Sequence, residues 1–569
     1  MPEKLDRGAL ALPVEKGVYL SWRLFKDDPK GIAFDVYRKG ESDSDFMKLN
    51  KLPITKTTDF VDTTAKKDSS YVWKISVVGG DKAQDTEVSV AGECVKVDEH
   101  GYPYISIKLQ DDEIASRVAV ADLNGDGKLD YIVKKTPSIV DPYHMPGYWK
   151  KSKKTVTMEA YDHSGKFLWS HDFGWSLEQG IWYTPILVYD LDGDGCAEVI
   201  AKTGKGDPRD KNGRVHTDDE YLTVFDGMTG KVLDEIKWLP RVGYTYNLGC
   251  RNFLGVAYLD GKTPFLVAHR GTYGMMREAI YEFVNKKLVE KRYWSNAFET
   301  TKETWGQGAH RLHAADIDGD GFEEVIIGSF AFDHDGSVLW STGLGHPDHM
   351  FVGELNPHHD GLEIYYGMES RNDKNGMNMI HAKTGEFIWG LQEKSYHIHS
   401  NGLCSDIDPR YPGYECFGGE SKNDFKNDRY LWTADGELLA RGTTEKEVGI
   451  PGLGAISVWW DGQPDRVITR GNSKNGVFMR LHFPKQEMLQ KTGFMGSIIL
   501  TGDFFGDWRE ELVTSLPGEV RIYSTTIPAK NRHVSLIQDR NYRATTIENM
   551  CGYTSVPVPS YDPNNEPAK

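Results

Sequence analysis

Several features that define common classes of protein are missing from this chain of 569 residues. It has no run of eighteen apolar residues, so we expect no segment to cross a membrane as a helix. The opening, MPEKLDRGAL, contains no apolar stretch of the kind that forms a secretory signal. Six cysteines are scattered along the chain, which excludes a disulfide scaffold and a CxxC zinc site. We expect isolated thiols, with Cys404–Cys416 as the one candidate bridge.

Positive charge is also scarce, because 67 Lys and Arg residues face 84 Asp and Glu residues and the formal net charge is −17. Binding nucleic acid requires a basic surface that neutralises phosphates, so we expect no nucleic-acid partner. The chain is rich in glycine, with 59 residues, and 12% of it is aromatic, which excludes disorder, collagen and a plain helical bundle. Its length is about four times that of a typical domain, so we expect several domains or one large repeat array.

The first hundred residues predict a separate β unit. The segments GVYLSWRL, IAFDVYRKG, TDFVDTT and SYVWKISVVGG alternate apolar and polar residues and are separated by Gly, Asp and Lys, which is typical of antiparallel strands. This spacing predicts a small β-sandwich of fibronectin or immunoglobulin type over residues 1–97. The segment carries no cluster of His, Asp or Cys, so we expect it to pack against the main body.

From about Tyr104 onward the chain repeats one plan, an Asp-rich turn followed by an apolar strand. The strongest copies are VAVADLNGDGKLDYIVK, LVYDLDGDGCAEVIAK and HAADIDGDGFEEVIIG, and five weaker copies bring the number to eight. Hairpin sequences such as VFDGMTGKVL and FDHDGSVLW lie between them. A period of about four strands is typical of a propeller blade, whereas a parallel β-helix has shorter and more regular periods. We therefore predict an all-β fold with an eight-bladed β-propeller over residues 98–569.

The three strongest Asp-rich turns predict cation sites. Alternate oxygen-bearing side chains in a tight loop point to one centre, and hard oxygen ligands favour calcium. Their spacing before a strand differs from that of an EF-hand, and a solvated turn without an ion remains the alternative. We expect these ions to be structural. The predicted ligands are Asp122, Asn124, Asp126 and Asp130, then Asp190, Asp192, Asp194 and Glu198, then Asp316, Asp318, Asp320 and Glu324.

A second set of residues predicts a catalytic site rather than a structural ion site. His310, His346, Asp348 and Glu369 lie at the ends of predicted strands beside runs of glycine. Two imidazoles and two carboxylates can bind a divalent cation, either calcium or a transition metal, although histidines also cap loops. In SYHIHSNG, His397 and His399 alternate, so both are expected to point to one side of a strand, and an imidazole can move a proton near neutral pH.

Several motifs together resemble the rhamnogalacturonan lyases of polysaccharide lyase family 11. They are STGLGHPDH, DIDPRYPG, VYDLDGDG, GVAYLDG and above all GDFFGDWREEL, followed by RIYSTTIP and DRNYR, and the similarity runs from LDRGALALPVEKGVYLSWRL to about Arg543. The resemblance implies an N-terminal β-sandwich, an eight-bladed propeller with bound calcium, and β-elimination in a uronate-containing pectin backbone. It also implies that the cluster at His310, His346, Asp348 and Glu369 holds the active-site cation.

Other positions depart from the family pattern. The family's Asn-Asp pair before the first Asp-rich turn, the Asp after the following strand, an Arg of the sixth repeat and an Asn-Gly-Thr-Lys stretch are all replaced, and the tail ENMCGYTSVPVPSYDP also differs. A pocket that loses polar groups loses affinity, so we expect poor activity on ordinary rhamnogalacturonan I. The replacing residues are Ser116 and Arg117, Thr136, Asn401, and Thr492, Gly493, Phe494 and Met495.

The candidate site residues follow from this comparison with the family. A lyase acidifies the proton next to a uronate carboxylate and places a base there, and the family's Lys and Arg for this role are absent. The candidate catalytic residues are His399, His397, Lys202, Arg270 and Lys422. The candidate substrate-binding residues are Tyr273, Trp305, Arg470 and Tyr553, because sugar rings stack on aromatic faces, as they also could on Trp182, Tyr183 and Tyr366.

We expect a polysaccharide lyase that is secreted, periplasmic or at the cell surface and that acts on a rhamnose- and uronate-containing polysaccharide. We also expect a monomer. Two alternatives remain open from the residues. One is a glycoside hydrolase that uses two carboxylates such as Glu369 and Glu420, whose separation would bear on this mechanism. The other is a calcium-dependent carbohydrate-binding propeller without catalysis.

Overall fold

The computed structural model describes residues 4–66, 69–80, 85–90, 94–136, 141–143, 148–299, 303–399, 402–420, 427–452, 454–470, 477–482, 485–491 and 493–564. The side chains of residues 470, 477–480, 482, 485–486 and 490–491 are excepted. Strands dominate these residues, so the prediction of an all-β protein is confirmed. In this described part no helix has the length and apolar character needed to span a membrane.

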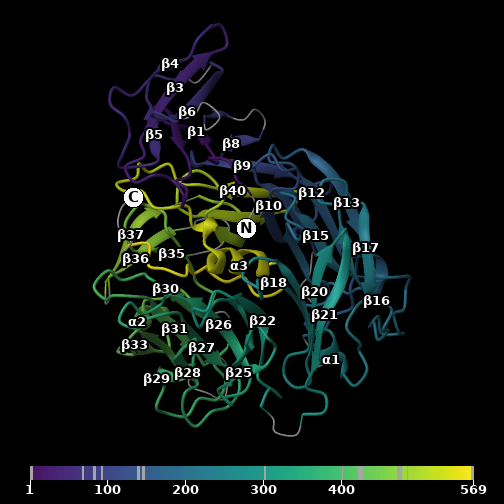
Figure 1. The fold of residues 1–569 in the computed structure, drawn as a ribbon. Helices are drawn as coiled ribbons and strands as arrows, with labels where there is room; N and C mark the ends of the chain where they lie inside the picture. The colour runs from purple at the N-terminus through teal and green to yellow at the C-terminus, as the bar shows by residue number, and fades with distance from the viewer. Residues whose placement is uncertain are drawn as a thin grey trace.

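Two small sheets at the N-terminus share one hydrophobic core (the purple unit in Figure 1). Alternation places Leu20, Phe34, Val36, Trp73 and Ile75 in this core, as the sequence pattern predicts. The first sheet has the order β1 (Leu10–Val14), β2 (Gly17–Ser21) and β5 (Asp59–Asp62). The second sheet has the order β4 (Met47–Lys48), β3 (Phe34–Gly40), β6 (Tyr71–Val77) and β7 (Thr86–Ser89).

Eight antiparallel sheets follow, and we number them 1 to 8 in chain order. In sheets 1 to 7 each strand pairs with its neighbour in sequence, whereas sheet 8 is completed by two strands from before sheet 1. Sheet 1 contains β10 (Ala115–Ala121), β11 (Asp130–Lys135), β12 (Thr157–Tyr161) and β13 (Phe167–Asp172), and sheet 2 contains β14 (Ile186–Tyr189), β15 (Glu198–Gly204), β16 (Glu220–Phe225) and β17 (Val232–Lys237). Sheet 3 contains β18 (Asn252–Ala257), β19 (Phe265–Arg270), β20 (Arg277–Val284) and β21 (Lys287–Ser295), and sheet 4 contains β22 (Gly308–Ala315), β23 (Glu324–Gly328), β24 (Phe330–Phe332) and β25 (Val338–Ser341).

Sheet 5 contains β26 (Pro347–Gly353), β27 (Glu363–Met368), β28 (Met377–His381) and β29 (Phe387–Gly390), and sheet 6 contains β30 (Leu403–Ser405), β31 (Glu415–Gly419), β32 (Arg429–Trp432) and β33 (Leu438–Gly442). Sheet 7 contains β34 (Ile456–Val458), β35 (Val467–Arg470), β36 (Val477–His482) and β37 (Lys485–Lys491), and sheet 8 contains β38 (Ser497–Gly502), β39 (Glu511–Leu516), β40 (Glu519–Tyr523), β9 (Pro103–Lys108) and β8 (Val95–Val97). The strand β8 therefore pairs with the large unit, at the end of the segment predicted as the sandwich.

Successive sheets pack face to face. Separate hydrophobic clusters join sheet 1 to sheet 2, sheet 2 to sheet 3 and so on, and a further cluster joins sheet 8 to sheet 1. Burial also changes across a sheet, because first strands such as β10 and β22 are almost wholly buried while outer strands such as β21 are largely exposed. The first strand of each such sheet therefore lies inside the molecule.

The helix α3 (Arg540–Glu548) lies among these first strands (Figure 1). It contacts β10, β14, β18, β22 and β38, and its residues from Asn541 to Glu548 are buried. The side chain of Asp539 caps it by accepting a hydrogen bond from the Tyr542 amide at 2.8 Å. The other helical segments are short: α1 (Tyr246–Gly249), α2 (Glu445–Val448), Gly174–Ser176 and Leu536–Gln538.

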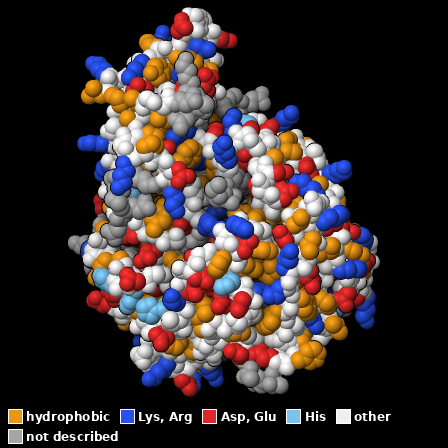
Figure 2. Space-filling view, in the orientation of Figure 1, with side chains coloured by type: hydrophobic (Ala, Val, Ile, Leu, Met, Phe, Trp, Pro, Cys, Tyr) orange, Lys and Arg blue, Asp and Glu red, His pale blue; other side chains and the backbone are white. Residues whose placement is uncertain are grey.

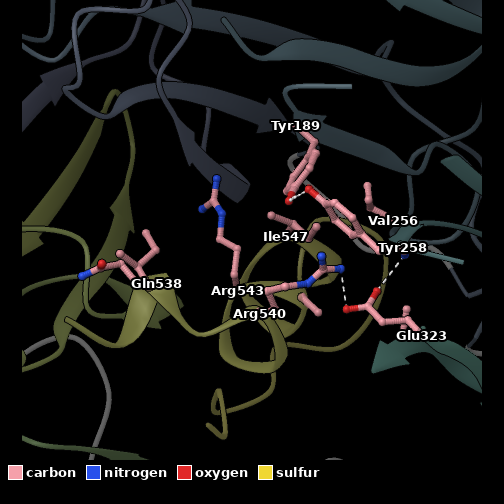
Figure 3. Close-up of a pocket in the computed structure, with 11 residues that line it drawn as sticks. Tyr189, Val256, Tyr258, Glu323, Gln538, Arg540, Arg543 and Ile547 are labelled. Atoms are coloured by element: carbon pink, nitrogen blue, oxygen red, sulfur yellow. Dashed lines mark hydrogen bonds and ion pairs between the residues drawn. The ribbon is translucent and has the colours of Figure 1, made fainter. Parts of the chain in front are cut away.

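Figure 3 shows the contact of α3 with sheets 2, 3 and 4. Arg540 forms an ion pair with Glu323 and lies 3.2 Å from the ring centroid of Tyr258, whose hydroxyl is 3.0 Å from that of Tyr189. The enclosed space measures about 20 Å³, which is room for one water molecule. This polar contact therefore anchors the helix rather than binding a ligand.

The residues of the motif FGDWREE connect three separate parts of the molecule. Arg509 pairs with Asp507 at 2.6 Å and donates to the hydroxyl of Tyr19 in the N-terminal unit. Glu510 accepts from Arg466 of sheet 7 and from the Tyr542 hydroxyl of α3, both at 2.7 Å. The motif that best marks the resemblance thus ties the N-terminal unit, sheet 7 and α3 together and lies outside the cavity described below.

Cys404 and Cys416 face each other directly in β30 and β31, but both are free thiols with their sulfurs 3.6 Å apart. The candidate bridge is therefore wrong for this structure, because a disulfide requires sulfurs about 2.05 Å apart. On the surface, acidic and basic side chains are interspersed over the face shown in Figure 2.

Candidate active site

The candidate active site is a cavity of about 710 Å³. Its lining includes Arg251, Tyr273, His310, Glu369 and Tyr553, together with the segment that carries His397 and His399. A second cavity, of about 1030 Å³, lies on the N-terminal unit, and none of its lining residues belongs to the His and carboxylate groups described here. We therefore place the chemistry in the first cavity.

The four residues of the predicted cluster come together at this cavity. One side-chain ligand atom from each of His310, His346, Asp348 and Glu369 lies within 4.8 Å of all the others. His310 Nε2 is 3.5 Å from Asp348 Oδ1, and His346 Nε2 is 3.0 Å from Glu369 Oε2. Three of the four residues are buried, so the set can hold a cation with little exposure to solvent.

Irregular strand ends bring these side chains together. The pairing of β22 with β23 shifts between Gly308 and His313, and that of β26 with β27 shifts between Pro347 and His349. Such bulges turn a strand and redirect its side chains. Glu369 follows β27, and its amide donates to the carbonyl of His346 at 3.0 Å. Sheets 4 and 5 therefore present the four residues from adjacent strand ends.

The protonation of His346 follows from its contacts. Its Nδ1 lies against the carbonyl of Gly308, so this nitrogen carries the proton and donates it. The buried Nε2 then holds a lone pair that faces a carboxylate oxygen of Glu369 without an acceptable hydrogen bond. A lone pair and a carboxylate repel each other unless a cation lies between them, so this donor set fits a divalent metal ion.

Burial and neighbouring charges perturb the acid–base groups of the cluster. Burial, with His346, Arg251 and His399 nearby, lowers the pKa of His310 well below its usual value, so His310 is a neutral ligand. Burial would raise the pKa of Glu369, but the positive charge that the surrounding histidines His346, His397 and His399 can carry brings it down to about 2. Glu369 is therefore a carboxylate at all working pH values.

The two predicted histidines flank the cluster. His399 Nδ1 contacts Asp348 Oδ2, His397 Nε2 lies 3.7 Å from Glu369 Oε1, and the two rings are 4.7 Å apart. They lie side by side as the sequence predicts, but on irregular backbone rather than on a strand. Glu420 holds this segment, because it accepts the amides of Tyr396 at 2.9 Å and His397 at 2.8 Å.

The sequence did not single out Arg251, which lines the cavity and is 2% exposed. Its guanidinium lies 4.1 Å from the ring centroid of Trp182, and Nη2 contacts Asp141 Oδ1 at 3.0 Å. Nη1 is buried with no hydrogen-bond partner among the described residues. Its position resembles that of His310, because Arg251 directly precedes β18, the first strand of sheet 3, and His310 lies near the start of β22, the first strand of sheet 4.

Lys202 and Arg270 do not line the cavity. Both are buried in an ion cluster around Glu220, where Lys202 Nζ lies 2.6 Å from Glu220 Oε1. Burial lowers the pKa of Lys202 to about 8 despite Glu220, and the cations around Glu220 outweigh burial and bring its pKa to about 2. This cluster stabilises sheets 2 and 3, so we do not assign these residues a catalytic role. Lys422 and the side chain of Arg470 lie outside the described residues.

Of the candidate aromatic residues, some line the cavity and one lies at the surface outside it. Tyr553 lines the cavity with its ring 5.4 Å from that of His310, and the Tyr273 hydroxyl lies 3.0 Å from His310 Nε2. Trp305 is 40% exposed and is not part of the lining. Trp182, Tyr183 and Tyr366, on which sugar rings could also stack, are buried, so the structure does not offer their faces at the surface.

Among the positions that depart from the family pattern, Arg117 has a structural role. Arg117 donates to the carbonyl of Gly552 at 2.7 Å, next to Tyr553, and so fixes the tail against the cavity. Thr136 is buried, and the Met495 amide donates to the hydroxyl of Tyr523 at 3.2 Å. Asn401 lies outside the described residues.

The three Asp-rich turns share one hydrogen-bonding plan. The first Asp accepts two glycine amides, as Asp122 does from Gly125 and Gly127 at 2.7 Å each. The last acid accepts the amide of the apolar residue directly after the first Asp, as Asp130 does from Leu123 at 3.0 Å. Burial and neighbouring carboxylates raise the pKa of Asp130 to about 7 and that of Glu324 to about 8. In both turns a cation would relieve carboxylates that are held close together.

Comparison with known proteins places these features in a family. Residues 110–565 match the model described as rhamnogalacturonan lyase family 11, C-terminal domain, and residues 1–91 match that described as rhamnogalacturonan I lyases beta-sheet domain. The chain is 33% identical over 601 residues to the rhamnogalacturonan endolyase YesW of Bacillus subtilis (strain 168), covering 98% of this chain and 90% of that protein. It is 32% identical over 615 residues to the rhamnogalacturonan exolyase YesX of the same organism, covering 98% and 95%.

Solved structures agree. The structure of YesX has a TM-score of 0.84 at 29% identity, and that of YesW has 0.84 at 31%. A Bacillus licheniformis rhamnogalacturonan lyase has 0.83 at 31%. Each alignment covers 100% of this chain and 98% of the other. The similarity thus extends over both the N-terminal unit and the eight sheets.

Proposed function

This chain belongs to rhamnogalacturonan lyase family 11, and we propose that it cleaves a rhamnose- and uronate-containing polysaccharide by metal-assisted β-elimination. The observation that carries this proposal is the cluster of two histidines and two carboxylates that opens onto the 710 Å³ cavity. A bound divalent cation would neutralise the uronate carboxylate and so acidify the neighbouring C–H. His310, His346, Asp348 and Glu369 would hold that cation.

Arg251 is proposed as a second partner of the uronate. Its Nη1 is buried in the cavity lining and finds no hydrogen-bond partner in the described part of the chain. Nε and Nη2 already donate to Asn247 and Asp141, so Nη1 is the donor that remains, and a charged guanidinium donor favours a carboxylate oxygen as its acceptor. The aromatic face of Trp182 and the carboxylate of Asp141 keep it oriented.

His399 is proposed as the base. Its Nδ1 contacts Asp348, so this nitrogen carries the proton and Nε2 is left with the lone pair. Removal of the proton beside the uronate carboxylate forms a carbon–carbon double bond and breaks the bond to the leaving sugar oxygen, which then takes up a proton. Burial raises the pKa of Tyr273 well above its usual value, so this phenol remains protonated and can donate a hydrogen bond to that oxygen. His397 is the alternative base.

The hydrolase alternative is less well supported. A glycoside hydrolase needs one carboxylic acid with a raised pKa to protonate the leaving group. Glu369 has its pKa lowered to about 2, which is not the environment of a general acid. Glu420 accepts the backbone amides of Tyr396 and His397 and so positions that segment.

Incubation with a panel of rhamnose-containing uronans tests the proposed reaction. A lyase produces both ultraviolet absorbance from the unsaturated uronate and new reducing ends. Reducing ends without absorbance would replace the proposal with a hydrolase, and neither signal would replace it with a binding protein. Arg251→Met should raise KM strongly, and Arg209→Met is the matched control, because Arg209 lies 3.8 Å over the ring of Trp175 outside the cavity lining. An equal change in both variants would remove Arg251 from the site.

We also propose the finer architecture. Eight sheets in chain order, the hydrophobic clusters between neighbours and the completion of sheet 8 by β9 support an eight-bladed propeller over 98–569, with a sandwich of fibronectin or immunoglobulin type over 1–97. We propose that calcium binds in the first and third Asp-rich turns. We also propose that the enzyme works outside the cytoplasm, where it would encounter intact polysaccharides. Metal analysis of the purified protein, with detection of the native protein in cell fractions, tests these points.

A further inference from the structure

The hairpin between β20 and β21 carries a lysine in an unusual backbone conformation. Val284 pairs with Lys287, so the loop consists of Asn285 and Lys286 alone. Both residues have left-handed backbone, with φ values of 51° and 58°. Such two-residue loops strongly favour Asn followed by Gly. Here the position of the glycine is taken by Lys286, whose Cβ makes this conformation unfavourable. Contacts elsewhere must therefore stabilise it.

Those contacts are the carboxylates of the second Asp-rich turn. Lys286 Nζ lies 2.6 Å from Asp192 Oδ2, 3.0 Å from Asp194 Oδ2 and 3.2 Å from Glu198 Oε1. An ammonium group has three hydrogens, so it can serve all three carboxylates at once. The lysine belongs to sheet 3 and the turn to sheet 2, so the contact joins neighbouring sheets.

These oxygens belong to the ligand set that the sequence predicts for calcium. A calcium ion would bind them at 2.3–2.6 Å, in the space that the ammonium group fills, and the two cations would repel each other. The remaining member of the set, Asp190, accepts the amides of Gly193 at 2.8 Å and Gly195 at 2.9 Å. We propose that the second Asp-rich turn holds the Lys286 ammonium in place of a calcium ion.

The charge state of the lysine agrees with this role. A lysine amine carries a positive charge at neutral pH, and the three groups it meets here are carboxylates at 2.6, 3.0 and 3.2 Å. The link between sheets 2 and 3 consequently needs no metal.

The first and third turns are different. A histidine from the same sheet faces each of them: His163 Nδ1 is 3.8 Å from Asp130 Oδ1, and His334 Nδ1 is 3.5 Å from Asp320 Oδ2. Lys383 donates to the backbone carbonyl of Asp318 at 2.8 Å. Among the described residues, no Lys or Arg forms an ion pair with a predicted ligand of these two turns. Within the described part of the chain, the second turn is therefore the one of the three that a Lys or Arg side chain enters.

Calcium stoichiometry tests the proposal. The protein is stripped with a chelator, dialysed against calcium, and the bound calcium per chain is counted. Lys286→Met, which keeps the length of the side chain and removes the charge, should bind one more calcium ion than the wild type. Lys287→Met is the matched control, because this neighbouring lysine pairs with Asp234 at 2.7 Å and its loss should leave the count unchanged.

A second comparison does not require the lysine variant to fold. Asp192→Asn in the wild-type background should leave the number of bound calcium ions unchanged, since no calcium ion occupies that turn. The equivalent change in the third turn, Asp318→Asn, shows the loss expected at a turn that does bind calcium. An unchanged count in Lys286→Met, or the loss of one calcium ion in Asp192→Asn, would overturn the proposal.

Discussion

Removal of calcium should destabilise the protein in a pH-dependent way. In the metal-free structure, burial and neighbouring carboxylates raise the pKa of Asp130 to about 7 and that of Glu324 to about 8. In the unfolded chain these carboxyl groups titrate near pH 4. Between about pH 4 and pH 8 the metal-free folded state therefore binds more protons than the unfolded state, so its stability falls as the pH rises through this window. A cation in each turn favours the charged carboxylates and removes this loss.

The size of the effect follows from the pKa shifts. Each shift is about three pKa units, which corresponds to a ceiling of ~4 kcal/mol per turn at about 1.4 kcal/mol per unit. Screening by solvent halves this to about 2 kcal/mol, since both turns lie at the surface. The unfolding entropy of a unit of this size is about 1 kcal/mol per kelvin, so the two turns together should lower the apparent Tm by roughly 4 °C.

The assay is thermal unfolding of the chelator-treated and the calcium-loaded protein at pH 5 and pH 8, with metal content measured in each sample. We expect a clear difference in Tm at pH 8 and little difference at pH 5, where both carboxyl groups are protonated in the metal-free protein. The apparent Tm is to be compared at one heating rate, because large proteins often unfold irreversibly. Equal Tm values at pH 8 after confirmed removal of calcium, or a larger difference at pH 5 than at pH 8, would refute the reasoning.

Three further predictions can be checked separately. His310→Ala and Glu369→Gln should each abolish turnover while the circular dichroism spectrum and Tm stay close to the parental values, and near-parental turnover in either variant would remove the cluster from the mechanism. Lys134 is buried, its ammonium group meets only backbone carbonyls among the described residues, and burial lowers its pKa to about 7. Because the unfolded chain binds this proton up to about pH 10, wild-type stability should rise relative to Lys134→Met between pH 7 and pH 10, and parallel stability profiles would contradict this. Unmodified rhamnogalacturonan I should be a poor substrate, since each buried polar partner lost from a pocket costs about 1–3 kcal/mol, and cleavage as efficient as that by YesW would show that the replacements are compensated.

Much of the local structure was predictable because it depends on neighbours in sequence. Alternation of apolar and polar residues located the strands, and the Asp-rich turns have the same hydrogen bonds in all three copies because Asp122, Asp190 and Asp316 accept amides from glycines three and five residues ahead. The cluster of His310 with Glu369 was also proposed from the sequence, on the ligand chemistry of two histidines and two carboxylates and on the resemblance to the family, and the structure brings these residues together.

The remaining features depend on contacts between distant segments, which no local pattern specifies. Lys202 was a candidate catalytic residue, yet it lies buried 2.6 Å from Glu220. The motif FGDWREE marked the resemblance to the family, and only the structure shows that it connects the N-terminal unit, sheet 7 and α3. Glu420 reaches across to hold the segment of His397, and Lys286 enters an Asp-rich turn of the neighbouring sheet.

The sequence by itself determined the all-β class, the repeat plan and the oxygen-rich turns, because periodicity and turn chemistry act within a few residues. The tertiary structure alone decided which side chains meet. Arg251 lines the cavity while Arg270 is buried beside Glu220, although both are arginines at the ends of strands in sheet 3. One strand end faces the cavity and the other the interior between sheets, and that difference arises only when the sheets pack together.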